Sequence, residues 1–179
     1  MSLCITGLEK HHDRANFDCG EPQLNAYLQR LARQQAQRDF SRTYVAHSAD
    51  EAGSQTPYIQ GFYAISSGSL DFKNLPAGLK LPRYPVPVAR IGRLAVDLRA
   101  QGLGVGAALL LHAMELSVTL AQQIGLYALV VDAKHEAAAA FYARYGFQRF
   151  VDQPLSLFLT TDTIRRAIAT PNAPSDKTL

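Results

Sequence analysis

Cysteine is scarce in this chain of 179 residues, and its two copies, Cys4 and Cys19, stand apart without a CxxC spacing. No cluster of histidines accompanies them. A zinc site or a disulfide framework needs several cysteines or histidines at short, regular spacing. The sequence therefore predicts neither a metal site nor a disulfide framework, and it is typical of a protein of the reducing cytoplasm.

Long apolar runs are also missing. The longest one, residues 103–111, is interrupted by glycines and is half as long as a membrane-spanning helix requires. The first residues, Met1 to Ile5, lack the basic-then-apolar order of a signal peptide. We expect neither a membrane span nor export.

The chain does contain enough apolar material for a core. Hydrophobic residues make up 47% and charged residues 18% of the sequence, against roughly 25% charged residues in typical soluble domains. A chain of this length buries roughly 70% of its unfolded surface and fills one domain. We predict a single domain over residues 1–170 and a polar, disordered tail over residues 171–179, with no internal repeat.

Positive charge is unevenly distributed along the chain, although the formal net charge is only +3. Residues 72–96 contain no Asp or Glu, and residues 30–42 form a second basic cluster interrupted only by Asp39. The first stretch carries Lys73, Lys80, Arg83, Arg90 and Arg93, and the second carries Arg30, Arg33, Arg38 and Arg42. The pattern fits either a solvated basic surface or a polyanionic ligand, and composition leaves both open.

Hydrophobic periodicity predicts a mixture of helices and partly antiparallel strands. Helices are expected over residues 22–38, 104–124 and 135–145, the last ended by Gly146. Strands are expected over residues 43–46, 58–66, 88–96, 126–132, 147–151 and 155–160. The proline-rich stretch 74–87 should be irregular.

The most informative segment is the glycine-rich turn between the strand 88–96 and the helix 104–124. Gly102, Gly104 and Gly106 allow close approach of a ligand, and the first amides of the helix have no partner inside it. Together with the helix dipole they suit a pyrophosphate. A glycine turn with no ligand is the plain alternative.

Dinucleotide binding is another interpretation of the same turn. Gly102, Gly104 and Ala107 satisfy G-x-G-x-x-A, and Asp132 closes the next strand, where a ribose-binding acid can lie. A Rossmann unit, however, continues into a second parallel half, whereas antiparallel strands precede this motif. The match is therefore weak.

Coenzyme A binding explains more of the sequence. Residues 101–106, Gln-Gly-Leu-Gly-Val-Gly, fit the (Gln/Arg)-x-x-Gly-x-(Gly/Ala) turn of the Gcn5-related N-acetyltransferases (GNAT), and residues 141–147 resemble the aromatic-Tyr-x-x-x-Gly-Phe ending of that family. The resemblance covers roughly residues 16–160. It implies an α+β fold with a central, mostly antiparallel mixed sheet flanked by helices, and acetyl-CoA as the donor.

The resemblance also implies roles for individual residues. The backbone of Leu94, Ala95 and Val96 would hold the pantetheine arm, and Tyr142 would be the general acid, with Tyr145 left to packing. The pyrophosphate would be bound by the backbone of Gln101, Gly102, Leu103, Gly104, Val105, Gly106 and Ala107. His135 stands where the family usually has Asn, and Ala138 matches the family on the coenzyme side.

The lack of a general base restricts which kind of amine can accept the acetyl group. No Glu suited to that role occurs between residues 62 and 96. A lysine amine, with a pKa near ~10.4, needs help to lose its proton, whereas an α-amine near ~7.7–8.0 is already partly neutral at physiological pH. The sequence therefore favours an α-amine acceptor.

A second set of residues resembles a subgroup within this family, the bacterial toxins of toxin–antitoxin modules. It comprises Phe17-Asp18-Cys19-Gly20, Leu24, Tyr27-Leu28 and Gly92–Asp97. The resemblance implies acetylation of aminoacyl-tRNA, a ribbon-helix-helix antitoxin as partner, and frequent dimers. Acetylation of a small amine or a peptide N-terminus, and a noncatalytic coenzyme- or RNA-binding module, stay open as alternatives.

The basic clusters then become candidates for contacts to tRNA phosphates. We nominate Arg90 and Arg93, which lie on the predicted coenzyme strand. Lys80, Arg83 and Arg33 are looser candidates. Arg93 is equally suited to holding the geometry between strand and loop.

Overall fold

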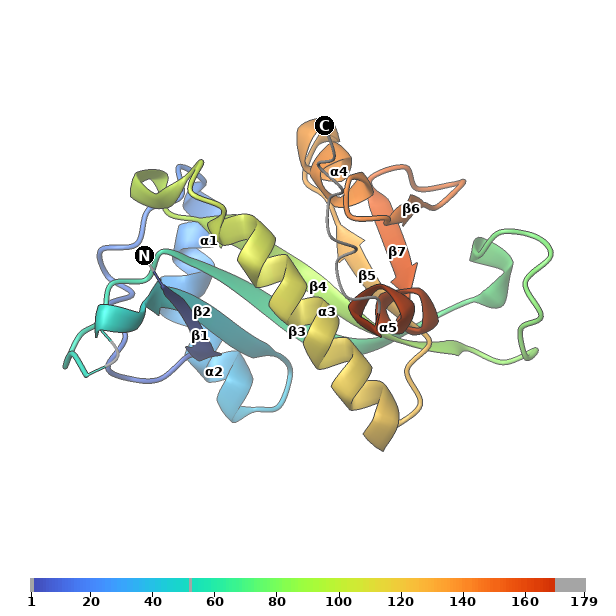
Figure 1. The fold of residues 1–179 in the computed structure, drawn as a ribbon, viewed down its shortest axis with the longest axis horizontal. Coiled ribbons are helices and arrows are strands. Elements are labelled where there is room, and N and C mark those ends of the chain that lie inside the picture. Colours follow the sequence, from blue (N-terminus) through green and yellow to red (C-terminus); the bar gives the residue numbers. More distant parts are fainter. Residues whose placement is uncertain (1, 52, 170–179) are drawn as a thin grey trace, which may run out of the picture.

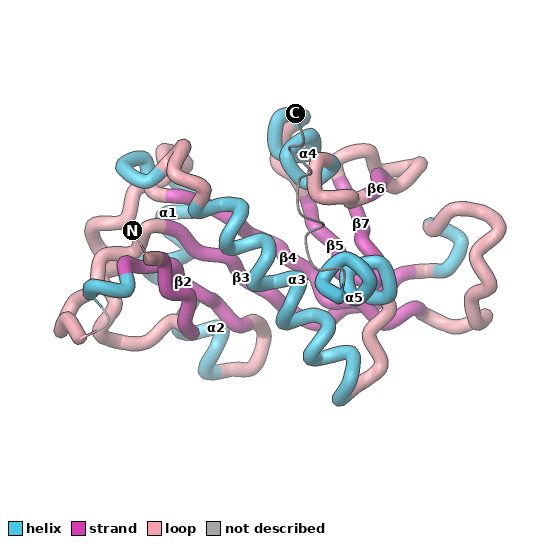
Figure 2. The backbone as a smooth tube through the Cα atoms, viewed as in Figure 1, coloured by secondary structure: helices cyan, strands magenta, loops and turns pink. Residues whose placement is uncertain are grey.

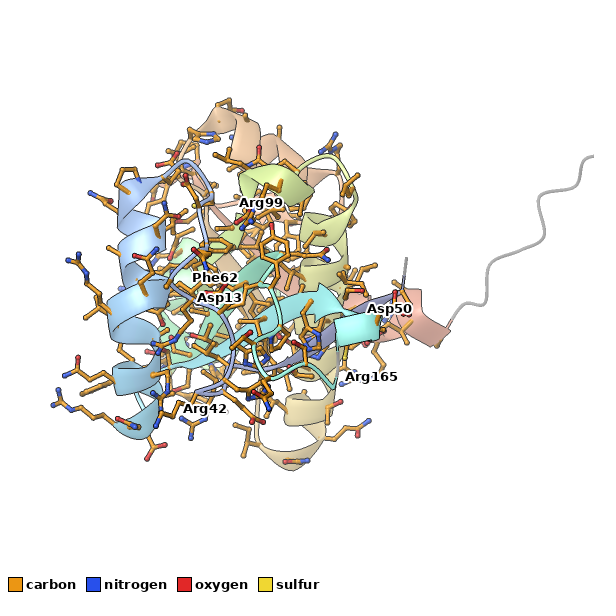
Figure 3. All side chains as sticks on the ribbon, turned by 90° about the vertical axis from the view of Figure 1, so that its left-hand side faces the viewer. Asp13, Arg42, Asp50, Phe62, Arg99 and Arg165 are labelled. Carbon is orange, nitrogen blue, oxygen red and sulfur yellow. The ribbon has the colours of Figure 1, made fainter. Side chains whose placement is uncertain are left out.

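The computed structural model describes residues 2–51 and 53–169, which form a sheet between two layers of helices (Figures 1 and 3). The strands are β1 Leu3–Gly7, β2 Arg42–Ser48, β3 Gly61–Leu70, β4 Val86–Val96, β5 Ala128–Asp132, β6 Gln148–Arg149 and β7 Ser156–Thr160. The α-helices are α1 Pro22–Ala26, α2 Ala32–Gln37, α3 Val105–Gln123, α4 Glu136–Ala143 and α5 Thr161–Ala169. Shorter helical turns are η1 Tyr27–Leu31, η2 Ala49–Glu51, η3 Phe72–Asn74 and η4 Leu98–Ala100. The predicted tail, residues 171–179, lies outside the described residues.

The sheet has the order β1-β2-β3-β4-β5-β7-β6. Its neighbours pair antiparallel except for β4 and β5, which pair parallel. The mixed, mostly antiparallel α+β fold is therefore confirmed, and a doubly wound parallel sheet is not present in the described chain. The parallel pair joins 88–91 only to 128–131, so the end of β4 separates from β5.

A register shift in β3 and β4 decides where the side chains of β4 point. Ile65 pairs with Ile91 and Ala64 pairs with Arg93, which leaves Gly92 without a partner in β3. One extra residue in a strand reverses the side-chain alternation beyond it. Ile91 thus packs in the core beneath α3, whereas Ala95 packs in the core beneath α1 and α2.

The helix predicted over residues 22–38 is confirmed as the continuous run α1, η1 and α2, with Pro22 in its first turn. Tyr27, Leu28 and Ala32 are buried and pack with Phe62 of β3. In the end-on view of Figure 3, these helices lie on one side of the sheet and α3 lies on the other.

Helix α3 crosses the second face of the sheet, and α5 packs beside it (Figure 1). Among the described helices it is the one long and apolar enough to cross a membrane, although the sequence run 103–111 predicted none. Val105, Leu109, Leu110 and Ala113 are buried against the sheet. One such helix is weak evidence for a membrane span, because core helices of soluble proteins pass the same test, and one side of α3 is buried in the core.

Other predicted elements are confirmed with shifted ends, and two elements were not predicted. The antiparallel pair is β2 and β3, and the closing strands are β6 and β7. β1 is a short edge strand and α5 follows β7 without a break. β1 is a short strand without a clear alternating pattern, and α5, although strongly amphipathic, lies in a mostly polar stretch close to the predicted tail; neither was predicted.

Candidate active site

A cavity of about 260 Å³ lies where β4 and β5 separate. One wall comes from the segment before and within α1, and the opposite wall comes from the end of β5 and from α4. The lining residues are Cys19, Glu21, Leu24, Gly92, Arg93, Leu94, Ala95, Val96, Gln101, Asp132, Ala133, Lys134, His135, Ala138 and Tyr142. Sequence motifs far apart in the chain therefore meet in one place.

The end of β4 is the floor of this cavity. β4 is paired with β3 up to Val96, but its edge toward β5 is unpaired beyond Ile91. The strand edge at Leu94, Ala95 and Val96 consequently faces the cavity. An extended ligand arm can add to this edge as a further strand does.

The glycine turn sits at the end of the floor and leads into α3. Gly102 and Gly104 have φ angles of +78° and +80°, in the left-handed region that favours glycine. The backbone amides from Val105 to Ala107 belong to the first helical turn and have no intrahelical acceptor. The turn therefore presents donors and the positive end of the helix dipole to an anion.

Gln101 holds this turn with its side chain. Its Nε2 donates to the carbonyl oxygen of Val96 at 3.1 Å and to that of Cys19 at 3.5 Å. The side chain thus ties the turn to the floor and to the wall that precedes α1. Of the predicted coenzyme residues, 94–96, Gln101, His135 and Ala138 line the cavity, while 102–107 form the adjoining turn.

Tyr142 projects from α4 into the cavity and is only 6% exposed. Its ring packs against Phe141 and Phe147, with centroid distances of 5.3 and 5.8 Å. Burial, and to a smaller extent the negative charge of Asp132, raise the pKa of Tyr142 to about 12. Tyr145 instead packs against Phe141 and is absent from the cavity lining.

His135 is the N-cap of α4. Its Nδ1 accepts a hydrogen bond from the amide of Ala138 at 3.2 Å, as the side-chain oxygen of an asparagine N-cap does. The histidine therefore fills the capping role available to the usual Asn of the family, and its ring lies at the cavity.

The N-terminal wall is held by Asp97, whose side chain is 1% exposed. Its carboxylate accepts from the amides of Asp18 and Arg99 and from the Arg99 guanidinium, which also reaches the carbonyl of Asn16. Burial opposes ionisation of Asp97, but hydrogen bonds from Arg99, Tyr58 and the two amides outweigh it and lower its pKa. Asp97 thereby joins the end of β4 to residues 16–18.

Asn25 fixes the next part of this wall. Its Oδ1 accepts from the amide of Cys19 at 2.9 Å, and its Nδ2 donates to Asp18 Oδ1 at 2.8 Å. Asp18 also accepts from the amide of Gly20. The Phe17-Asp18-Cys19-Gly20 motif is therefore a loop fixed by hydrogen bonds, and it shapes one side of the cavity.

The nominated basic residues lie in different places. Arg93 lines the cavity, with its guanidinium 3.9 Å from the centre of the Tyr27 ring. Arg90 donates to both oxygens of Asp132, at 2.9 and 2.7 Å. Arg33 is half-buried on α2, whereas Lys80 and Arg83 are exposed in the loop between β3 and β4, which projects from the body in Figure 2.

Sequence reasoning overlooked two charged pairs at the cavity. Asp132 was considered only as a ribose-binding acid, yet it lies beside Tyr142 and is paired with Arg90. Glu21 and Lys134 form an ion pair that joins the two walls. Only the three-dimensional arrangement reveals these pairs, because their members are far apart in sequence. Among residues 2–51 and 53–169, no group of His, Cys, Asp or Glu is placed to hold a metal ion.

A splayed parallel strand pair, an anion-binding turn and a buried phenol define an acetyltransferase-type site. Residues 39–149 match the family described as "Acetyltransferase (GNAT) domain". The chain belongs to the GNAT family.

Two similar proteins are named as toxins. The chain is 36% identical to a "tRNA-acetylating toxin" of Mycobacterium tuberculosis, over 87% of this chain and 90% of the relative. It is 32% identical to "Probable toxin TacT" of Sinorhizobium fredii, over 86% of this chain and 88% of the relative.

Solved structures agree with these relatives. A tyrosine-to-phenylalanine mutant of KacT superposes with a TM-score of 0.86 at 32% identity, covering 93% of this chain and 99% of KacT. The structure of AtaT complexed with acetyl-methionyl-tRNAfMet superposes with a TM-score of 0.84 at 29% identity, covering 93% and 99%. Another structure holds mutant AtaT with the C-terminus of the antitoxin AtaR and acetyl-CoA, at a TM-score of 0.80, 27% identity and coverage of 94% and 99%.

Proposed function

We propose that this protein is the toxin of a type II toxin–antitoxin module and blocks translation by acetylating the α-amino group of aminoacyl-tRNA. Acetyl-CoA is the acetyl donor. The observation that carries the proposal is the cavity in which the unpaired edge of β4, the glycine turn and Tyr142 meet, in a chain 36% identical to a tRNA-acetylating toxin.

The cavity and turn fit acetyl-CoA in two respects. The free edge of β4 at 94–96 suits the amides of a pantetheine arm, and the first amides of α3 suit a pyrophosphate. Bound along this line, the thioester lies at the Tyr142 end of the cavity.

Tyr142 is the proton donor in the proposed transfer. The neutral acceptor nitrogen attacks the thioester carbonyl carbon; a C–N bond forms and the C–S bond breaks. The leaving sulfur takes the Tyr142 proton, and the nitrogen then returns one proton to the phenolate. The products are an amide and a free thiol.

The raised pKa of Tyr142 sets a condition on this step. With a phenol near 12 and a thiol near ~8.5, proton donation as an isolated step is uphill by about 5 kcal/mol. Proton donation by Tyr142 must therefore accompany C–S cleavage, and the positioning of the phenol beside the sulfur offsets the free-energy cost. The phenol is fully protonated at every physiological pH.

The α-amine of an aminoacyl ester fits this site better than a lysine amine. Both acidic side chains that line the cavity are held in ion pairs, Glu21 with Lys134 and Asp132 with Arg90. An acceptor that is already partly neutral near pH 7.5 needs no dedicated base. An acceptor on tRNA is in line with the name of the M. tuberculosis relative, a "tRNA-acetylating toxin".

The proposed partners follow from the same relatives. A ribbon-helix-helix antitoxin is the expected protein partner; AtaT is bound to its antitoxin, and KacTA is solved with DNA. We also propose a homodimer that acts in the cytoplasm, where charged tRNA is found. Arg93 is the leading candidate for a phosphate contact because it lies in the cavity, and Arg90, Arg33, Lys80 and Arg83 are secondary candidates.

The test is incubation with labelled acetyl-CoA and total charged bacterial tRNA. We expect label in the aminoacyl fraction and none on deacylated tRNA, and the labelled amino acid identifies the acceptor. Tyr142→Phe protein is the matched control. If no label is transferred by protein that binds acetyl-CoA, the acceptor is a small amine or a peptide N-terminus.

A further inference from the structure

Asp132 is one of the two acidic side chains that line the cavity, and it has no role in the proposed transfer through Tyr142. It ends β5, and its side chain follows that of Val130 to the face of the sheet opposite α3. The cavity there is also lined by Gly92, Arg93 and Tyr142. The contribution of Asp132 to the raised pKa of Tyr142 shows that its charge acts on the phenol.

The carboxylate of Asp132 is held in a fixed orientation. Arg90 Nη1 donates to Oδ1 at 2.9 Å and to Oδ2 at 2.7 Å. Ser156 Oγ donates to Oδ1 at 2.9 Å. These donors come from β4 and β7, the strands on either side of β5, so three adjacent strands position one carboxylate.

Oδ2 keeps the capacity to accept from a ligand. A carboxylate offers about four acceptor positions, and within the described chain Oδ2 accepts only from Arg90. The Asp132 side chain is 42% exposed, toward the cavity. A ligand N–H entering beside Tyr142 therefore finds an oriented, negatively charged acceptor.

The other carboxylates nearby cannot fill this place. Asp97 is 1% exposed, and its oxygens accept from Asp18 and Arg99. Glu21 is tied to Lys134 across the two walls. Of the two acidic residues that line the cavity, Asp132 is the one held by neighbouring strands of the sheet, through Arg90 and Ser156.

We infer that Asp132 Oδ2 accepts a hydrogen bond from the α-amino group of the acceptor and holds its nitrogen for attack, with Arg90 and Ser156 as positioning residues. This inference rests on the proposed function. Positive charge develops on the nitrogen as the C–N bond forms, and a fixed carboxylate stabilises it. Asp132 forms no covalent bond and carries no proton at the end of the reaction. Arg90 thus acts on the acceptor through Asp132.

The experiment compares wild-type protein with Asp132→Asn under saturating acetyl-CoA, with charged tRNA varied. We expect kcat/KM for charged tRNA to fall by about 10- to 100-fold, the range for a lost hydrogen bond to a charged group. The Kd for acetyl-CoA, measured separately by calorimetry, should stay within about twofold because the amine subsite lies apart from the pyrophosphate turn. Asp162→Asn, on exposed α5, is the matched control and should leave both quantities unchanged.

Ser156→Ala keeps the charge of Asp132 but removes one of the groups that orient it. We expect kcat/KM for charged tRNA to fall by about twofold to tenfold in this variant, again at constant acetyl-CoA affinity. It keeps the inference testable if Asp132→Asn fails to fold.

Two results overturn the inference. One is an unchanged kcat/KM in Asp132→Asn; the other is an equal loss of acetyl-CoA affinity, which a merely structural role predicts. Failure of the proposed function is separate, because it appears as absence of transfer to charged tRNA by the wild-type protein itself.

Discussion

The two walls of the cavity are built differently. The C-terminal wall consists of a strand end and a helix, which carry Asp132, His135 and Tyr142. The N-terminal wall is the loop 16–21, held by hydrogen bonds to Asp97 and Asn25. Chemistry therefore sits on regular elements, and the irregular wall supplies shape. Substitutions in the N-terminal wall should therefore lower stability and substrate affinity, whereas substitutions in the C-terminal wall should lower kcat.

The largest effect on stability is expected from Asp97→Asn. The substitution removes the charge that accepts from Arg99 and from the amides of Asp18 and Arg99, and hydrogen bonds to charged groups contribute about 1.5–3 kcal/mol. We expect the free energy of unfolding in urea to fall by about 2–3 kcal/mol. KM should rise because the N-terminal wall loosens.

Asp162→Asn, which removes an exposed charge from α5, is the control for Asp97→Asn. It should change the unfolding free energy by less than about 0.5 kcal/mol. Equal stability of the two variants would show that Asp97 does not hold the wall.

Gly104→Ala tests the turn between the walls. Nothing lies within 4 Å of a Cβ placed there, but φ is +80°, and an alanine in this region costs about 1–2 kcal/mol. We expect that loss of stability together with weaker acetyl-CoA binding, measured by calorimetry.

Gly125→Ala is the matched control for the turn, since it also meets nothing within 4 Å and does not have a positive φ. It should be close to neutral in both measurements. If Gly104→Ala behaves in the same way, the turn does not need its left-handed conformation.

His12 offers a pH test of the chain leading into the N-terminal wall. Burial and the neighbouring His11 lower the pKa of His12, and its Nδ1 accepts from the amide of Glu9 at 2.9 Å, which requires a neutral ring. A lowered pKa in the folded state means that stability is complete above about pH 6.5 and is lost below it.

Burial lowers the pKa of His112 as well, so both histidines should contribute to the same pH dependence. We expect the unfolding free energy to fall by up to ~1.4 kcal/mol per pH unit for each histidine between pH 6.5 and 5. His12→Asn should remove roughly half of the slope. An unchanged slope would contradict the assignment.

The smallest effect is expected from Arg93→Ala. Its guanidinium lies over Tyr27 at the cavity, so its loss should raise KM for charged tRNA and reduce the slope of log KM against log salt by about 1. Arg38→Ala, on exposed chain near Phe40, should leave the slope unchanged. An unaltered slope for Arg93→Ala would assign this arginine to holding geometry alone.

The contrast between the walls also explains what the sequence revealed. Tyr142, the turn 101–107 and the strand 94–96 were predicted from motif spacing and resemblance, and the structure brings them together at one cavity. Asp97, Asp132 and Glu21 each have a partner far away in the sequence: Asp18, Arg90 and Lys134, at separations of 79, 42 and 113 residues. No local pattern encodes such pairings.

The fold shows the same difference between local sequence patterns and long-range pairing. The helix 22–37 has a clear helical period, the helix 105–123 is apolar around most of its circumference, and the strand 86–96 is rich in β-branched residues; all three were predicted, with ends within two residues of those observed. The register shift at Gly92 was not predictable, since it depends on how β3 and β4 align. It turns Arg93 and Ala95 toward α1, and without it the cavity would present different side chains.

The most direct test of the division between the walls is Tyr142→Phe. This variant keeps the ring that packs on Phe141 and Phe147 and removes only the proton donor. The measurement pairs kcat for acetyl transfer to charged tRNA with the Kd for acetyl-CoA. We predict a loss of about 10²–10⁴-fold in kcat, with Kd within about twofold of wild type. Retained turnover would contradict the account, and so would a parallel loss of acetyl-CoA binding.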